Sequence, residues 1–468
     1  MTALSETKGY QAYPEYKDSG VEWSDALPLS WGTVNLRWIS TIYAGGTPSK
    51  TNQSFWENGT VPWINSGAVN QGLVTKPSTL ITEQAYQNSS AKWIPKGSLV
   101  IALAGQGKTK GMVAQLAIDS TCNQSMGAIV PECSEHPRYL YWWLTSNYQN
   151  IRNMAGGDLR DGLNLEHLGS IQCPQPSIDE SVSIANFLDH ETAKIDTLIE
   201  KQQQLIKLLK EKRQAVISHA VTKGLNPQAP MKDSGVEWLG EVPEHWQIKK
   251  IKHFGRVIGG YAFKSGDFVE QGYPVIKITN VSHLKLSFTE QAFLPEKFSY
   301  ENSEYIAPQN SLVFAMTRPI ISGGIKVAKM PKLEKMPLIN QRVGFLKIED
   351  EDLTNFILLS SLSNSFVAQF KNNMTITNQP NISSEGIESV SLPLPPTAEL
   401  KLITDYLNNN ERRFNKLIKK SNNQVEFLQE RRTALISAAV TGKIDVRHFT
   451  PKEGQAPTSK EQALEQTA

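Results

Sequence analysis

Two stretches of the chain share a series of matching segments, which we call the frame. Residues 17–23 read Lys-Asp-Ser-Gly-Val-Glu-Trp, and the same seven letters recur at 232–238, an offset of 215. Ordered matches follow at offsets that drift from 215 to 219: Pro28 with Pro243, Trp31 with Trp246, Asn123-Gln124 with Asn340-Gln341, Pro174 with Pro393, and residues 213–222 with 432–441. Seven consecutive identities followed by ordered matches indicate a tandem duplication with a period near 217.

The two copies have diverged unevenly. Their openings and their final helical stretches agree well, whereas the interiors, roughly residues 35–170 and 250–390, agree only at scattered hydrophobic and glycine positions. One explanation is that surface loops drift faster than a scaffold. The other is that the two interiors recognise different ligands on a shared frame.

Each interior is predicted to be mixed α/β. Short β-rich runs at 99–103, 112–114 and 274–278 are separated by Gly, Pro, Asn and Ser, which favours strands joined by turns. Residues 137–147 carry aromatic and leucine side chains at helical spacing, and 353–363 is the counterpart in the second copy.

Each copy then ends in a long predicted helix with a heptad pattern. The heptad positions alternate in steps of three and four, most of them are apolar, and no Pro or Gly interrupts them. The apolar ones are Ile184, Leu188, Ile195, Leu198, Leu205, Leu209 and Val216 in the first copy, and Ile403, Leu407, Phe414, Leu417, Leu428 and Leu435 in the second. A helix over 184–220 would be about 55 Å long. Two matched stripes in one chain favour mutual pairing over packing of each helix on its own domain.

These patterns divide the chain into five segments. We expect a first mixed domain over 1–178, a helix over 179–224, a linker and second mixed domain over 225–398, a second helix over 399–443, and a polar disordered tail over 444–468.

Composition excludes several classes of protein. Lys and Arg total 48 against 46 Asp and Glu, a net charge of +2, so no large field of one sign is expected. The three cysteines form no CxxC or Cys/His cluster, which argues against structural zinc and disulfides. No apolar run approaches the length of a membrane span and no export signal precedes the frame, so we expect no membrane partner and no export.

One segment resembles a nucleotide-binding loop. Residues 102–109 read Ala-Leu-Ala-Gly-Gln-Gly-Lys-Thr after a predicted strand, which would make the chain an ATP-hydrolysing enzyme dependent on Lys108. A phosphate loop must open a helix, but residues 111–118 have the pattern of another strand, and the aligned 315–319 lack Gly-Lys-Thr. We therefore expect a glycine-rich hairpin. No catalytic trio, amino-methyltransferase motif or metal-ligand spacing is present, so the sequence predicts a non-catalytic chain with no catalytic and no metal site.

Nucleic-acid binding has more support. Arginine suits bidentate contacts to guanine or phosphate, and amides suit adenine edges. The candidate DNA-binding residues are basic and lie on predicted loops: Lys50, Lys108, Lys110 and Arg160 in the first copy, and Lys264, Arg318, Lys326 and Arg342 in the second. Two diverged modules on a rigid spacer have the geometry needed to read two half-sites.

The repeated opening with Pro-x-x-Trp, the two diverged interiors, and the two long helices ending in Ile-Ser-x-Ala-Val-Thr together resemble the specificity subunits of type I restriction–modification systems. The resemblance covers nearly the whole chain. It implies an α+β fold with two target recognition domains separated by two long helices that pair as an antiparallel coiled coil. The apolar heptad residues given above would form the seam between the two helices, and we call them the seam residues. They would then also serve partner docking.

The same resemblance implies a non-catalytic targeting subunit in the cytoplasm of a bacterium or archaeon. Its partners would be double-stranded DNA, two methyltransferase subunits and, in a larger complex, restriction subunits. S-adenosylmethionine, ATP and Mg would be bound by those partners and not by this chain. The remaining alternative is a coiled-coil scaffold that joins two protein ligands without DNA recognition.

Overall fold

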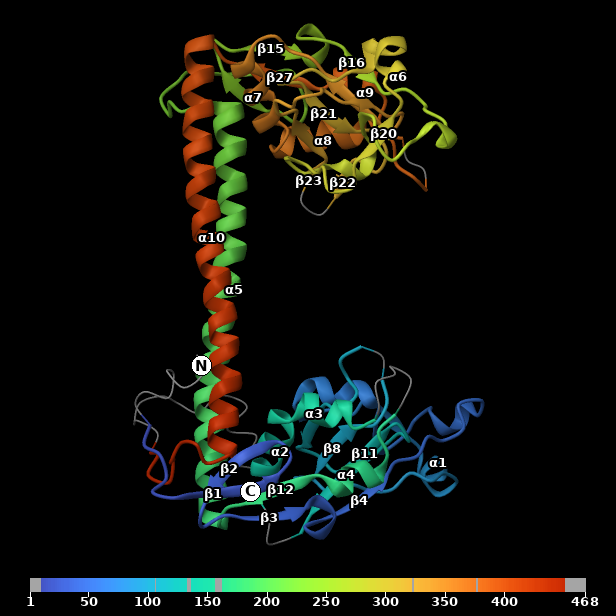
Figure 1. The fold of residues 1–468 in the computed structure, drawn as a ribbon, viewed down its shortest axis with the longest axis vertical. Coiled ribbons are helices and arrows are strands. Elements are labelled where there is room, and N and C mark those ends of the chain that lie inside the picture. Colours follow the sequence, from blue (N-terminus) through green and yellow to red (C-terminus); the bar gives the residue numbers. More distant parts are fainter. Residues whose placement is uncertain are drawn as a thin grey trace. The chain divides into compact units, whose positions relative to one another are not determined.

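A computed structural model describes residues 10–105, 107–132, 136–155, 162–321, 324–375 and 378–450 (Figure 1). The chain divides into two compact units: unit 1 consists of residues 1–202 and 423–468, and unit 2 of residues 203–422. The long helices α5 (Ile178–Lys223) and α10 (Thr397–Val440) each contribute to both units. A unit is therefore not a sequence copy, because it combines one interior with a part of each long helix.

The strands of unit 1 form two main sheets and two antiparallel two-stranded pairs. The order is β4-β11-β8-β9-β6 in the larger sheet and β10-β5-β7 in the smaller, with β1 beside β2 and β3 beside β12. Their bounds are β1 (Tyr16–Val21), β2 (Ser24–Pro28), β3 (Gly32–Asn35), β4 (Ser40–Ala44), β5 (Val61–Ile64), β6 (Leu73–Val74), β7 (Thr79–Ile81), β8 (Leu99–Ala102), β9 (Val113–Leu116), β10 (Thr121–Cys122), β11 (Met126–Pro131) and β12 (Gln172–Gln175).

Unit 2 repeats this arrangement with a four-stranded sheet, β16-β26-β21-β24, and a three-stranded sheet, β20-β17-β25. The strands are β13 (Met231–Asp233), β14 (Glu241–Pro243), β15 (Gln247–Lys250), β16 (Val257–Gly259), β17 (Tyr273–Ile276), β18 (Val281–Ser282), β19 (Lys285–Leu286), β20 (Ala292–Leu294), β21 (Leu312–Ala315), β22 (Ile320–Ile321), β23 (Gly324–Ile325), β24 (Val327–Lys329), β25 (Leu338–Ile339), β26 (Val343–Leu346) and β27 (Ser391–Leu394). The central strands β8 and β21 are buried along their whole length, which explains their continuous apolar sequences.

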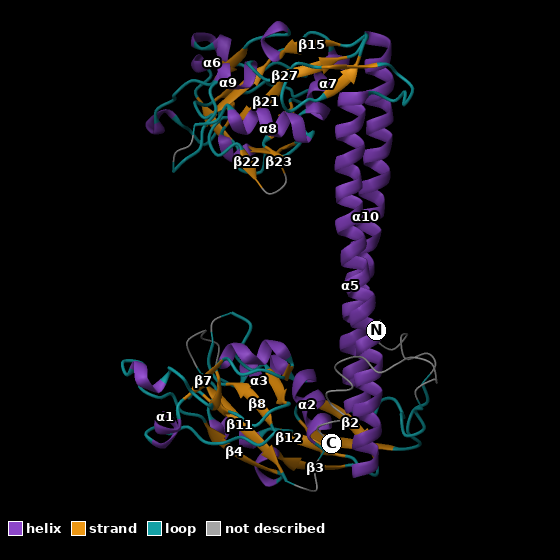
Figure 2. Ribbon diagram, turned by 180° about the vertical axis from the view of Figure 1, so that it is seen from behind, coloured by secondary structure: helices purple, strands orange, loops and turns teal. Residues whose placement is uncertain are grey.

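Short helices lie around the strands of each unit (Figure 2). They are α1 (Glu83–Gln87), α2 (Pro137–Ser146), α3 (Tyr148–Asn153) and α4 (Leu165–Ser170) in unit 1, and α6 (Lys297–Glu301), α7 (Glu351–Ser360), α8 (Asn364–Asn372) and α9 (Ser384–Glu388) in unit 2. The helix predicted over 137–147 is α2, and its predicted counterpart is α7, which begins two residues earlier than expected because Asp350 caps it.

The repeated opening motif folds into the same turn in both units. Gly20 and Gly235 have positive φ angles of 63° and 66°, and the N–H of each donates to the carboxylate two residues earlier, Asp18 or Asp233. The glycine supplies a left-handed conformation at no steric cost, and the aspartate stabilises the turn through its side chain. The identical letters in the two copies therefore encode one local structure.

Within each unit the long helices pair antiparallel. In unit 1, Ile184 near the start of α5 shares a hydrophobic core with Val440 at the end of α10, while Asp196 further along bonds to Arg432. In unit 2, Val221 at the end of α5 shares a core with Ile403 near the start of α10. The antiparallel pairing implied by the family resemblance is thus present in both units.

Both long helices end at a glycine that packs on a buried tryptophan. Gly442 has a φ of 66° and a Cβ there would overlap Pro28, with Trp31 also close; Gly224 has a φ of 75° and faces Trp246. Left-handed glycine is a common helix terminator because it lacks a Cβ. The end of each long helix therefore packs on the opening segment of the other copy. The end of α10 packs on the opening of the first copy, and the end of α5 on the opening of the second.

The tail begins later than the sequence predicted. Ile444 and Val446 are buried in the core of unit 1, and the ring of Phe449 meets that of Phe187 edge-on with centroids 5.0 Å apart. Gln11 also forms a β-bridge with Asp445, so the two described ends of the chain meet in this unit. The expected disordered tail over 444–468 is wrong for 444–450, because these apolar side chains bury surface there; residues 451–468 lie outside the described part of the chain.

Candidate nucleic-acid interface

In each unit, an Asn-Gln dipeptide directly follows one edge strand of the three-stranded sheet. Asn123-Gln124 follows β10, which runs parallel to β5, and Asn340-Gln341 follows β25, which runs parallel to β17. The N–H of Asn123 donates to Ile64 and that of Asn340 donates to Ile276, both at 3.0 Å. We call residues 123–124 and 340–341 the Asn-Gln loops. In both, the asparagine is half-buried and the glutamine is exposed.

A close backbone approach holds each Asn-Gln loop in place. Gly45 donates its N–H to Met126 at 3.2 Å, and Gly260 donates to Val343 at 2.8 Å. A Cβ at Gly45 would overlap the carbonyl oxygen of Cys122, and one at Gly260 would overlap that of Asn340. Only glycine therefore fits at these two positions, which are equivalent in the two units.

In unit 2 the Asn-Gln loop borders a basic pocket. The pocket has a volume of about 190 Å³ and is lined by Lys277, Ile278, Thr279, Asn340, Gln341 and Arg342. The Lys277 ammonium lies over the ring of Phe268, 4.0 Å from its centroid. A cation, a guanidinium group and side-chain amides at one surface site suit an anionic or hydrogen-bonding ligand such as a nucleic-acid strand.

Of the residues predicted to contact DNA, this pocket contains Arg342. Lys277 was missed, as was the role of the Asn-Gln match, which served only to align the two copies. One signal could have found them. Lys277 comes directly after a buried strand, and the Asn-Gln pair is repeated in both copies. The remaining predicted residues do not line this pocket.

The other predicted contacts lie at separate places in the two units. Lys50, Lys108, Lys264 and Arg318 are exposed, and Lys326 is half-buried. Arg160 lies outside the described residues. Lys110 was expected on a loop surface and is only 4 % exposed, with its carbonyl facing Arg152, so the structure places this side chain in the interior of unit 1 and we withdraw it as a contact.

The loop that resembles a nucleotide-binding site joins two antiparallel strands. Residues 103–112, apart from the undescribed position 106, connect β8 to β9, which pair antiparallel from Leu99 with Gln115 to Ile101 with Val113. No helix begins after Lys108-Thr109, so the amides of a helix N-terminus are not available for phosphates there. The predicted hairpin is confirmed.

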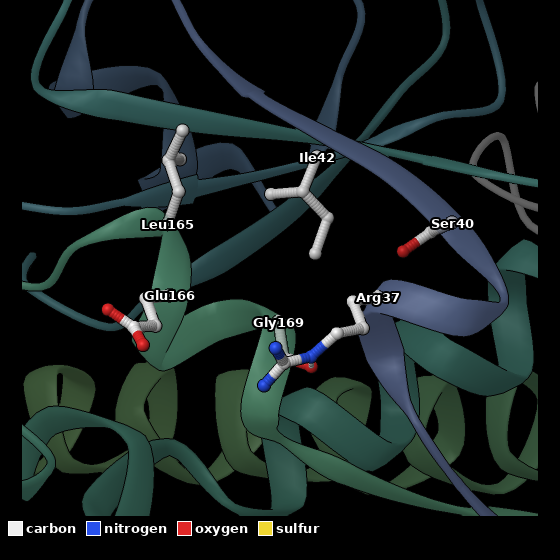
Figure 3. Close-up of a pocket in the computed structure, with 6 residues that line it drawn as sticks. All are labelled: Arg37, Ser40, Ile42, Leu165, Glu166 and Gly169. Carbon is white, nitrogen blue, oxygen red and sulfur yellow. Dashed lines mark hydrogen bonds between the residues drawn. The ribbon is translucent and has the colours of Figure 1, made fainter.

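A second pocket lies in unit 1, at the open edge of the larger sheet. It has a volume of about 280 Å³ and is lined by Arg37, Ser40, Ile42, Leu165, Glu166 and Gly169 (Figure 3). Arg37 donates from Nε to the carbonyl of Gly169 at 3.1 Å, and the Glu166 carboxylate points away from the guanidinium group. At the β16 edge of the larger sheet of unit 2, Glu388 accepts the N–H of Val257 at 2.7 Å. The lining residues of the unit 1 pocket do not form a catalytic set of side chains.

The predicted seam residues fall into three groups. Ile184, Leu188, Ile195, Leu428 and Leu435 are buried in unit 1, and Ile403, Leu407 and Phe414 in unit 2. Leu209 and Val216 are half-buried. Leu198, Leu205 and Leu417 are the most exposed of the set, at 48, 43 and 40 %. Their role in partner docking stays a prediction.

In the part of the chain that the structure describes, no group of His, Cys, Asp and Glu side chains is arranged to hold a metal ion. In the same described residues, none of the helices has the length and apolarity needed to cross a membrane.

Taken with the doubled frame, these features define a protein with two similar mixed domains, each presenting an Asn-Gln pair at one edge of a small sheet, with basic side chains beside it in unit 2. The family model of the Type I restriction modification DNA specificity domain matches twice, at residues 28–208 and 243–427. The chain therefore belongs to the family of type I restriction–modification specificity subunits, and the resemblance seen in the sequence is confirmed.

Individual relatives agree with this assignment. The chain is 25 % identical over 312 residues to the specificity subunit of the type I restriction enzyme MjaVIII of Methanocaldococcus jannaschii, covering 66 % of this chain and 71 % of that protein. It is 21 % identical to the MjaIX specificity subunit over 93 and 98 % of the two chains, and 33 % identical over 40 and 45 % to the EcoR124I/EcoR124II subunit of Escherichia coli.

Solved structures share the fold. A chain from a structure of the type I R-M system, concerned with its assembly and conformational transition, has a TM-score of 0.69 at 15 % identity, covering 89 % of this chain and 99 % of that one. The HsdS subunit from Thermoanaerobacter tengcongensis has a TM-score of 0.53 at 15 % identity over 91 and 100 % of the two chains. The predicted fold class, an α+β chain with two tandem recognition domains and two long helices, is confirmed.

Proposed function

We propose that this chain is the sequence-reading subunit of a type I restriction–modification complex, with each recognition domain reading one half of a split DNA target. The observation that supports this most directly is the double match of the DNA specificity domain, once in each sequence copy, on frames that are equivalent while their interiors differ. Two different recognition surfaces on one frame are what two different half-sites require.

The chain itself is proposed to be non-catalytic and to work in the cytoplasm. Two methyltransferase subunits would dock on the helical surfaces, and restriction subunits would join through them, with S-adenosylmethionine, ATP and Mg bound by these partners. The exposed Leu198, Leu205 and Leu417 support a docking role, because large apolar side chains on a helix surface favour burial against a partner. A net charge of only +2 supports weak DNA binding by the chain alone.

The test is to sequence the methylated bases of a host that expresses this chain with its neighbouring methyltransferase, and of one that lacks this chain. A split motif modified in both halves only when the chain is present is the expected result. An active methyltransferase with no chain-dependent motif would favour the alternative, a coiled-coil scaffold without DNA recognition.

A domain exchange tests the division of labour. Replacing residues 35–170 by the corresponding interior of a relative should change one half of the motif and leave the other intact. Removal of one heptad from each long helix should shorten the gap between the halves, because seven residues of helix correspond to about 10 Å. A motif changed in both halves by the exchange, or an unaltered gap after the deletion, contradicts the respective proposal.

A further inference from the structure

The Asn-Gln loops are a place where the diverged interiors keep both sequence and geometry. Gln124 and Gln341 are exposed at the same point of equivalent sheets, after strands with the same parallel pairing, Cys122 with Ile64 and Ile339 with Ile276. A surface that reads different bases in two half-sites has to differ between the units. A side chain that is exposed and repeated in both units is therefore expected to contact a part of the DNA that both half-sites share.

The sugar–phosphate backbone is the part of DNA that is the same in every half-site. A glutamine side chain can donate from its NH₂ group to a phosphate oxygen. In unit 1, the hydroxyl of Thr47 donates to Oε1 of Gln124, which orients the amide and leaves the NH₂ group as the end available for a ligand. In unit 2, the N–H of Gln341 donates to Oδ1 of Asn340 at 2.8 Å, which tightens the loop that carries the side chain.

The charges beside the unit 2 loop favour the same ligand. Arg342 follows Gln341 directly and is exposed, and Lys277 lines the same pocket. Two cations next to an amide donor favour a phosphate group over the neutral edge of a base. Rigid support from Gly260 means that little conformational entropy is lost when the loop binds.

We propose that Gln124 and Gln341 make equivalent phosphate contacts to the DNA backbone, one in each half-site, and that Arg342 and Lys277 strengthen the contact of unit 2. This inference rests on the proposed function, because it assumes that both domains face DNA. It adds a contact that positions each domain on the duplex without reading its sequence.

The experiment measures DNA affinity of the complex of the full chain with its methyltransferase, on a duplex with the methylated motif and on duplexes with one base changed in either half. Gln124→Ala and Gln341→Ala should each weaken binding by about 10-fold and by the same factor on all three duplexes, as expected for one lost hydrogen bond to a charged group. Gln341→Glu should weaken binding more than Gln341→Ala, because a carboxylate repels phosphate. Gln84→Ala and Gln247→Ala, at other exposed glutamines of units 1 and 2, are the controls and should bind normally.

Salt dependence distinguishes the neutral donor from the neighbouring cations. Gln341→Ala should leave the slope of log affinity against log salt unchanged, whereas Arg342→Ala should reduce its magnitude by about 1. Normal affinity of both glutamine variants, or a loss confined to one altered base position, overturns the proposal. If the unaltered complex shows no preference for the motif duplex, the proposed function itself fails, which is a different result from a selective complex that tolerates both variants.

Discussion

Trp246 donates its indole N–H to Glu399, with 2.9 Å between Nε1 and Oε2, and it does so from a fully buried position. Trp31 makes the same bond to Glu180 at 3.4 Å. Both glutamates lie in the first turn of a long helix, and both indoles also contact the glycine that ends the other long helix. Each tryptophan thus connects the opening of a copy to both helices, which explains why these segments match so well between the copies.

The indole bond should contribute more in unit 2 than in unit 1. Trp246→Phe keeps most of the ring and removes the donor, and we expect a loss of about 1 kcal/mol, because Glu399 is partly exposed and water replaces part of the bond. Trp31→Phe removes a bond of 3.4 Å, which is longer and weaker, so about half that loss is expected. Thermal unfolding of the full chain measures both. A larger destabilisation by Trp31→Phe would contradict the ranking.

Gly442→Ala should be among the most destabilising glycine substitutions in unit 1. The residue has a positive φ, and its Cβ would overlap the ring of Pro28. Strain from the left-handed backbone costs about 1 kcal/mol, and the overlap adds a further 1–3 kcal/mol. Gly20→Ala is the matched control, since φ is also positive but nothing lies within 4 Å of its Cβ. Equal losses in chemical denaturation would show that the packing around Gly442 relaxes freely.

Two ion pairs to α5 should differ in strength. Arg138 binds Asp189 through two nitrogens, Nε at 2.8 and 3.0 Å from the two carboxylate oxygens and Nη2 at 2.6 Å from Oδ1. Both side chains are about 15 % exposed, and Trp142 donates to the same carboxylate. We expect Arg138→Ala to cost about 2–3 kcal/mol, because the carboxylate loses its main partner in a partly buried place.

Arg432→Ala is the comparison, because its pair with Asp196 at 2.9 Å is 30 and 42 % exposed. About 0.5 kcal/mol is expected there. Urea unfolding of the two variants gives the free energies directly, and similar values for both would contradict the role that burial plays in this argument.

The buried thiol of Cys122 makes stability fall at alkaline pH. Burial raises the pKa of Cys122 from its ordinary value of 9.0 to about 12. Between these values the unfolded chain releases a proton that the folded chain keeps, so the free energy of unfolding decreases as the pH rises. Alkylation of Cys122 in the native protein, followed by peptide mass spectrometry from about pH 8 to about pH 10, should be far slower than in urea. Equal rates would show that the thiol is accessible.

Truncation should separate the ordered end of the chain from the polar tail. A chain ending at residue 442 loses Ile444, Val446 and Phe449 from the core of unit 1 and exposes Phe187, so its melting temperature should fall by several degrees. A chain ending at residue 450 keeps these contacts and is expected to melt like the full chain. An equally stable chain ending at 442 would mean that the packing at the chain end contributes little.

The parts of the structure that could be predicted depend on local sequence. Heptad spacing over 184–216 and 403–435 identified both long helices to within a few residues of α5 and α10. Short β-rich runs at 99–103 and 274–278 identified the strands β8 and β17. These patterns succeed because a helix or strand repeats its exposure at short, regular intervals along the chain.

The candidate site was harder to predict because it depends on contacts between distant residues. Lys277 and Arg342 are 65 positions apart, and only the parallel pairing of β17 with β25 brings them to one pocket. Lys110 had the sequence of a surface loop, and the packing of α3 against that loop buries it. A side chain's exposure is decided by such neighbours, which loop composition does not reveal.

By itself, the sequence determined that the frame is doubled, that two long helices end the copies, and that the interiors differ, because identity and periodicity are properties of the letters alone. Only the tertiary structure decided that each unit takes a part of both helices, that Trp31 and Trp246 join them, and that residues 444–450 belong to a core. These features arise from burial of apolar surface between segments hundreds of residues apart, and local sequence does not specify which segments will meet.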